Sequence, residues 1–284
     1  MHSRARTSRR ILTTLAAMAA AAGAQAAAAQ SYMSQAFIPG GEESLSIDLG
    51  GILNQFNTSL RLDGQTTRGT DINLENNGLK KNLSSFEAAL AWRFLSRHRI
   101  DAQYFTAKRS GSRDYTGEID IGGTPFPVGA NVFASSKDDF LLADYRYSFA
   151  KDPQYEVAAG IGFYGGKFTY DLNATGNGGT VQTTYNRSVS TTVPLPLLAL
   201  TFDWYPDRQW KFGAQFEGLK AKVSDVDGHA YVIGATAEYM LVRNFGLGMR
   251  YMYTDVGADV TKSDFNGNLA WKMNSVSLFG QLLF

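Results

Sequence analysis

The sequence has no cysteine, and its 284 residues include only three histidines and seven prolines. Without cysteine the chain can form neither a disulfide framework nor a thiolate metal site, and it has no cysteine nucleophile. No two histidines stand at metal-ligand spacing, so we predict no metal and no cofactor. The charge is balanced, with 27 Lys and Arg against 26 Asp and Glu. Nucleic acid is therefore not an expected partner.

The first thirty residues have the pattern of an export signal. Four arginines without an acid open the chain, an apolar run follows at 11–22, and small residues lead to Ala29. This order is typical of a secretory signal with an Ala-x-Ala cleavage site. We therefore predict a signal peptide over 1–29 and one mature domain over 30–284, with 23 basic and 26 acidic residues.

The mature chain has no run of 18 uncharged apolar residues, so a membrane-spanning helix is not expected. Instead, apolar residues alternate with polar or small ones, as in Leu141, Ala143, Tyr145, Tyr147 and Phe149. A period of two is typical of strands, whose successive side chains point to opposite faces. We predict ten strands, at 45–63, 84–96, 99–108, 138–150, 155–171, 192–205, 209–222, 230–241, 245–259 and 269–284.

The connections between these strands alternate in length. Tight turns such as 97–98 and 151–154 alternate with longer segments, including 64–83, 109–137 and 172–191. This alternation is typical of an antiparallel up-and-down barrel with turns at one rim and loops at the other. Eight or twelve strands stay open as alternatives, because the two longest segments have room for another hairpin.

Three features favour a barrel with its apolar face outward, toward lipid. The residues that alternate with the large apolar ones are rich in Gly and Ala, which suits a crowded lumen. Aromatic residues such as Trp92, Trp204 and Trp210 gather beside the short turns, as in the aromatic girdles of membrane barrels. The last predicted strand ends on Phe284.

With its signal, alternating hairpins and Phe284, the sequence resembles the bacterial outer-membrane β-barrels of the small OmpA/OmpW-like kind. The resemblance implies an all-β transmembrane barrel in the outer membrane of a Gram-negative bacterium. It also implies contact with outer-membrane lipid and lipopolysaccharide. Phe284 would act as the assembly signal that the barrel-assembly machinery reads on the C-terminal strand.

In such a barrel, the charged residues that alternate with the large apolar ones would face the lumen. They are Asp48, Glu87, Arg93, Asp101, Asp144, Arg146, Glu156, Asp203, Lys211, Glu217, Glu238 and Arg250. A ten-stranded barrel is only a little wider than one that side chains fill. Two interpretations are open: paired charges that make the barrel rigid, or a narrow, cation-preferring passage created by the excess of acid.

Two motifs carry possible chemistry. The segment from Gly160 to Gly165 matches G-x-G-x-x-G, but a strand pattern follows it where a nucleotide site needs a helix. We expect these glycines to relieve crowding in the lumen or to bend a strand. Asp227 and His229 are similar to the Asp–His half of omptin proteases, in which His would activate water and Asp would orient the imidazole.

The sequence thus predicts a non-enzymatic outer-membrane barrel with a structural or surface-binding role, which could include a narrow passage for small solutes or ions. Long loops rich in Asn, Gly, Ser and Thr are the candidate binding elements. One alternative is an omptin-like surface protease. The other is a soluble periplasmic β-barrel ligand carrier with its apolar faces inward.

Overall fold

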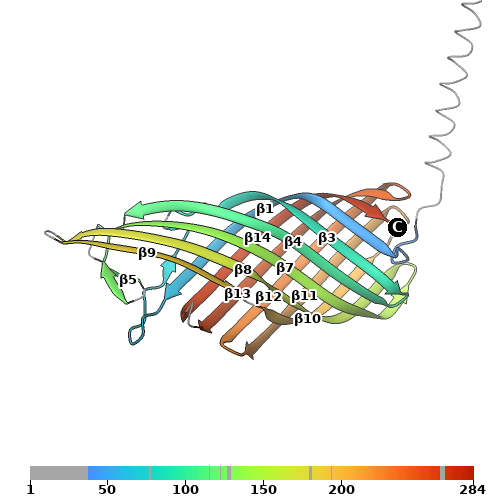
Figure 1. Cartoon of the computed structure of the whole chain (residues 1–284). Coiled ribbons are helices and arrows are strands. Elements are labelled where there is room, and N and C mark those ends of the chain that lie inside the picture. Colours follow the sequence, from blue (N-terminus) through green and yellow to red (C-terminus); the bar gives the residue numbers. More distant parts are fainter. Residues whose placement is uncertain are drawn as a thin grey trace, which may run out of the picture.

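The computed structural model describes residues 38–284, apart from 77, 115, 122, 127–128, 179–180, 193 and 263–265. The predicted signal peptide at 1–29 lies outside the described residues. Within the described residues the chain forms one long antiparallel barrel (Figure 1). None of these residues forms a helix long and apolar enough to cross a membrane.

Strands make up most of the described chain. In order they are β1 (Leu45–Leu62), β2 (Ile72–Asn73), β3 (Asn82–Leu95), β4 (His98–Asp114), β5 (Ile119–Ile121), β6 (Thr124–Phe126), β7 (Asn131–Asp152), β8 (Tyr155–Gly178), β9 (Val181–Thr192), β10 (Leu195–Trp204), β11 (Trp210–Val223), β12 (Val226–Val242), β13 (Phe245–Thr261) and β14 (Asn266–Leu283).

The wall of the barrel has ten strand positions, which confirms the predicted number. β1 pairs with β14 and closes the ring, from Ser46 opposite Leu283 to Leu62 opposite Gly267. One position is shared by two strands, because β8 pairs with β10 in its first half and with β9 in its second half. β10 pairs onward with β11, whereas no strand in the described part of the chain pairs with the other edge of β9.

Two of the predicted loops are mostly strand. β4 and β7 pair as far as Asp114 opposite Asn131, and β8 and β9 pair as far as Gly178 opposite Val181. The prediction of loops over 109–137 and 172–191 is therefore wrong in extent. Outside the bilayer one face of a strand meets water, so Ser, Thr, Asn and Gly replace the apolar half of the alternation. Within 109–137, only β5 and β6 form a separate hairpin, above the wall.

The predicted loop at 64–83 folds back onto the barrel. β2 pairs with the end of β1, with Ile72 opposite Leu60. Three apolar side chains of this segment, Ile72, Leu74 and Leu79, are at most 2% exposed. β3 then begins opposite Gln55. The side chains of Leu74 and Leu79 therefore reach the lumen and add to the core.

The outer face of the turn-end half is apolar. Ile161 is 63% exposed and Leu278 is 65% exposed, and Trp204 and Trp210 are exposed beside a turn. On β7 this zone, which we call the apolar belt, runs over the outward residues from Leu141 to Phe149. A continuous apolar band around a barrel is unfavourable in water and fits lipid. The predicted orientation of the faces is confirmed for this half.

The lumen has two levels of different polarity. At the turn end it is charged, as predicted. Toward the loop end the inward side chains are apolar, which the prediction of a polar lumen missed. The physical reason is the medium outside: above the apolar belt the outer face meets water, so the apolar side chains of the same strands turn inward, as in a soluble barrel.

An aromatic cluster fills the upper level. Phe140 of β7 stacks on Phe105 with ring centroids 4.6 Å apart, and it lies 5.5 Å from Phe168 and 6.0 Å from Trp271. These residues come from four different strands. Close packing of aromatic rings from several sides of the wall leaves the upper lumen occupied by side chains.

Candidate functional site

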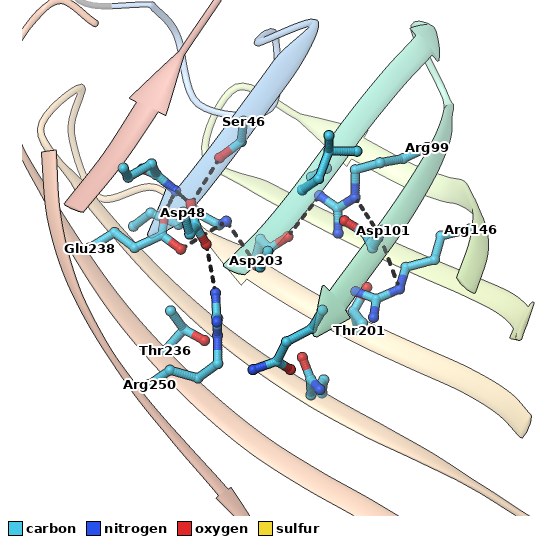
Figure 2. A pocket seen from close by; sticks show the side chains of 18 of the residues that line it. Ser46, Asp48, Arg99, Asp101, Arg146, Thr201, Asp203, Thr236, Glu238 and Arg250 are labelled. Carbon is cyan, nitrogen blue, oxygen red and sulfur yellow. Dashed lines mark hydrogen bonds and ion pairs between the residues drawn. The ribbon is translucent and has the colours of Figure 1, made fainter. Parts of the chain in front are cut away.

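The charged level of the lumen is the candidate functional site. All twelve predicted lumen residues alternate with outward side chains and face inward (Figure 2 labels six of them). Most are buried, and Glu87 and Glu217 are completely so. Arg99 belongs with them and was missed, although it shares its face of β4 with Asp101. Its position beside the turn at 97–98 hid it.

The first ion group lies nearest the turns. Arg93 donates two hydrogen bonds to the carboxylate of Glu156, at 2.9 and 2.8 Å, and Ser148 donates a short hydrogen bond to the same carboxylate. Glu43, in the segment before β1, lies 4.0 Å from the Arg93 guanidinium. A bidentate Arg–carboxylate pair of this kind fixes both side chains in one geometry. It ties β3 to β8 across the lumen.

The second group is centred on two arginines. Arg146 Nη2 lies 2.9 Å from Asp144 and 2.8 Å from Glu217, and Arg146 Nε lies 3.3 Å from Asp101. Arg99 donates to Asp101 at 2.9 Å and lies 3.6 Å from Asp203 (Figure 2). Four carboxylates and two guanidinium groups therefore share one network, and buried charges need such pairing.

The third group joins the strands beside the closure of the barrel. Arg250 of β13 lies 2.7 Å from Asp48 and 3.3 Å from Glu87. The Gln281 amide donates to both Asp48 and Glu238, at 3.2 and 2.9 Å, and Lys211 lies 3.4 Å from Glu238. These contacts connect β1, β3, β11, β12, β13 and β14.

A cavity of about 110 Å³ lies among these groups. Its lining includes Asp48, Arg99, Asp101, Asp203 and Arg250, which Figure 2 shows pointing toward the same space. Charged walls favour water or a small ion over an apolar ligand, and the volume is enough for a few water molecules. The cavity thus lies at the centre of the charge network.

The glycines of the G-x-G-x-x-G segment lie in the middle of β8, with no helix after them. A Cβ atom at Gly160 would overlap the carbonyl oxygen of Tyr145. One at Gly162 would overlap the carbonyl oxygen of Ala143 and the carboxylate of Asp144. These two glycines make room for β7 and its charges, in accord with the expected relief of crowding.

A separate polar group lies in the apolar level and was not predicted. Arg109, 1% exposed, lies 2.6 Å from Glu75 and 3.4 Å from Asp138, with its guanidinium 4.0 Å above the ring of Phe56. Glu75 also accepts a hydrogen bond from the Thr58 backbone at 2.6 Å. This group therefore fastens Glu75 and its neighbour Leu74 to the wall.

Asp138 itself lies above the apolar belt, between the outward side chains of Lys137 and Asp139. Burial raises the pKa of Asp138 to about 6, and the nearby Arg109 guanidinium acts in the opposite direction. Arg109 falls in the predicted loop at 109–137, and Glu75 falls in the one at 64–83. Asp138 is the first residue of the predicted strand 138–150, and it was missed because lumen charges were assigned only further along that strand.

Asp227 and His229 both lie on the outer face of β12, where they alternate with the buried Val226, Gly228 and Ala230. His229 Nε2 is 3.7 Å from Asp255, on the neighbouring β13, and among the described residues it has no ion pair with Asp227. In the same residues, no group of three or more His, Asp or Glu is arranged to hold a metal ion.

No protein-family model matches the sequence, and no curated protein matches it. Among solved structures, the outer membrane protease OmpT from Escherichia coli matches with a TM-score of 0.56 and 12% identity, over 88% of this chain and 99% of that chain. The toluene transporter TbuX of Ralstonia pickettii matches with a TM-score of 0.39 and 9% identity, over 85% and 90%. Ail, the attachment invasion locus protein of Yersinia pestis, matches with a TM-score of 0.31 and 11% identity, over 85% and 99%.

At these identities the likeness shows the fold alone, and the fold is that of the bacterial outer-membrane β-barrels. Together with the apolar belt, this fold places the protein in the outer membrane of a Gram-negative bacterium. A soluble carrier does not fit, because it would expose the belt to water.

Proposed function

We propose that the protein is a non-enzymatic outer-membrane barrel with a closed lumen, which acts through the surface that it presents outside the cell. The observation that carries this proposal is the filling of the lumen on both levels. Ion pairs span the turn-end level, and Phe140 with its aromatic neighbours occupies the level above. A passage for ions needs a continuous polar path, and the aromatic level interrupts it.

The surface that would act is the upper part of four strands. β4, β7, β8 and β9 continue beyond the rest of the wall at the loop end (Figure 1). Their outward side chains above the belt include Ser110, Ser135, Asn173 and Asn186. Polar groups on a rigid sheet outside the membrane are well placed to bind a partner. The charge network serves this surface by holding the wall below it in one shape.

The orientation follows from the two rims. Tight turns lie at the rim that also holds Phe284, whose backbone pairs with Leu45. Short turns face the periplasm in barrels of this class, so the extended strands would lie outside the cell. In the same proposal, lipopolysaccharide contacts the upper edge of the belt, the barrel-assembly machinery reads the C-terminal strand with Phe284, and nucleic acid is not a partner.

Two measurements test the proposal. In planar bilayers the purified protein should give no unitary conductance steps between −100 and +100 mV, which are roughly physiological potentials; repeated steps would reject the closed lumen. Because the chain has no cysteine, a single cysteine at Ser110 can be labelled selectively. A membrane-impermeant maleimide should label it in intact cells, whereas labelling only after the outer membrane is broken would reject the orientation.

The non-enzymatic part of the proposal has its own test. A panel of fluorogenic peptides should not be cleaved faster by the protein than by Asp227→Asn and His229→Ala variants prepared in the same way. Cleavage that depends on both Asp227 and His229 would reject the proposal and would instead indicate an omptin-like protease.

A further inference from the structure

Two lysines face each other across neighbouring strands on the outer face of the barrel. Lys108 of β4 and Lys137 of β7 are directly opposite in the strand register, and both side chains are exposed. Among the described residues neither ammonium group has a carboxylate partner. Like charges directly opposite each other on a sheet are destabilising. No ion pair within the described residues offsets this repulsion.

Two other outward cations of the barrel have carboxylate partners. Arg61 lies 2.9 Å from Asp63 and 3.6 Å from Asp259, and Lys272 lies 3.3 Å from Asp255. On the β4–β7–β8 side, a third exposed lysine, Lys167, stands opposite Asp139. The Asp139 carboxylate accepts a hydrogen bond from Tyr104 at 3.2 Å. A second carboxylate, Asp171 of β8, stands opposite Ser135 and accepts its hydroxyl hydrogen bond at 3.0 Å. Three lysines therefore face two carboxylates, and the patch keeps a net positive charge.

The height of this patch is defined by what lies directly below it. On the same outward faces, the next large side chains toward the turns are Tyr104 on β4, Leu141 on β7 and Phe163 on β8. These residues form the upper edge of the apolar belt, where the acyl chains of the outer leaflet join their headgroups. The ammonium groups thus lie at the level of lipid headgroups, and long lysine side chains reach readily to that level.

We propose that Lys108 and Lys137, with Lys167 beside them, bind a phosphate group of a phosphorylated glycolipid in the outer leaflet. Its phosphate would lie between the two opposed ammonium groups and its acyl chains along Tyr104, Leu141 and Phe163. A free phosphate ion would make only the first contact, so the apolar surface below favours the lipid. This inference rests on the proposed orientation, which places the lysines in the outer leaflet.

The test is a titration of the detergent-purified full-length barrel with diphosphorylated lipid A, followed by native mass spectrometry. The double variant Lys108→Gln/Lys137→Gln should bind lipid A roughly thirtyfold more weakly, because two lysines near a charged headgroup together contribute about 2 kcal/mol. Lipid A with both phosphates removed should bind wild-type protein as weakly as lipid A binds the variant.

A matched control is Lys220→Gln/Lys222→Gln. These two lysines of β11 are also exposed, but they stand opposite His229 and Asp227 rather than another lysine. This control should bind lipid A as wild-type does. Equal losses in both double variants would mean a general charge effect and would overturn the site.

A second variant separates binding from folding. Lys137→Glu places a carboxylate opposite Lys108, so the barrel should keep its heat-modifiable gel mobility while its lipid A binding falls as in the double variant. Undiminished lipid A binding by this variant would overturn the proposal, as would inorganic phosphate that binds as tightly as lipid A. The labelling at Ser110 tests the orientation independently, so failure of the site and failure of the orientation are distinguishable.

Discussion

Arg146 of β7 and Glu217 of β11 meet across the lumen at 2.8 Å, although two other wall positions separate their strands. Backbone hydrogen bonds connect only neighbouring strands, so this ion pair acts as a brace between distant parts of the wall. Breaking a buried pair leaves an uncompensated charge in a site of low polarity. The network should therefore matter more to stability than surface ion pairs do.

Replacing Arg146 by Met should destabilise the barrel by about 3–5 kcal/mol, since three carboxylates lose their shared cation. The measurement is urea unfolding of protein refolded in lipid vesicles, followed by tryptophan fluorescence. Combined with Glu217→Gln, the two changes should be non-additive by about 0.5–3 kcal/mol. Arg208→Met, at an exposed turn residue, is the control and should change stability by less than about 0.5 kcal/mol. Strict additivity would mean that the pair is not a brace.

Phe140→Ala should cost about 3–5 kcal/mol, because a large ring leaves the centre of the aromatic cluster and the wall collapses only in part. Phe133→Ala is the matched change on the same strand, where the side chain faces outward and is 38% exposed. Its effect should stay well below 1 kcal/mol. The same urea titration compares them, and similar losses for both would contradict a packed upper lumen.

Gly162→Ala should reduce the yield of folded barrel strongly, because the added methyl group overlaps the Ala143 carbonyl and the Asp144 carboxylate. Gly51→Ala is the control, since nothing lies within 4 Å of a Cβ atom built there. The control should fold as wild-type does or gain about 0.5–1 kcal/mol through lower backbone entropy in the unfolded chain. The folded fraction is read from gel mobility with and without boiling.

The pH dependence of stability should report Asp138. Its pKa of about 6 in the folded barrel exceeds its ordinary value of 3.8, so the folded state binds this proton more tightly than the unfolded state does. Stability should therefore fall as pH rises from about 4 through 6 and level off above, by on the order of 2 kcal/mol from this group. Urea midpoints at pH 4 and pH 7 measure the change.

Asp138→Asn cannot titrate, so its urea midpoint should lose that part of the pH dependence while the lower lumen is left unchanged. Asp120→Asn, at a half-buried position of the β5–β6 hairpin outside the wall, should keep the wild-type profile. An unchanged pH profile in Asp138→Asn would show that other groups govern the transition.

The ten strands could be predicted from the sequence because the apolar belt imposes a strict period of two on every wall strand. The same parity located the twelve lumen charges. It failed where the medium outside the barrel changes. On β7 the residues 141–149 place apolar side chains outward, whereas Val132, Ala134 and Phe140 place them inward. Periodicity alone does not reveal which face a side chain occupies, so the aromatic cluster was missed.

The buried group of Arg109, Glu75 and Asp138 was missed for a different reason. Glu75 reaches the lumen only because the chain turns inward after β2, and no local pattern specifies such a turn. The outward lysines Lys108 and Lys137 are neighbours only because of the register between β4 and β7. Contacts between residues far apart in sequence depend on strand pairing, and the pattern of one amino-acid sequence does not specify that pairing.

The pairing of β14 with β1 has a consequence for how the molecule is made. Until these two strands meet, every partly built form has a free edge on each side, and unpaired peptide groups are strongly disfavoured in hydrocarbon. Insertion should then be an all-or-none event rather than a strand-by-strand one. A chain shortened by a single hairpin should fail to insert rather than form a smaller stable barrel.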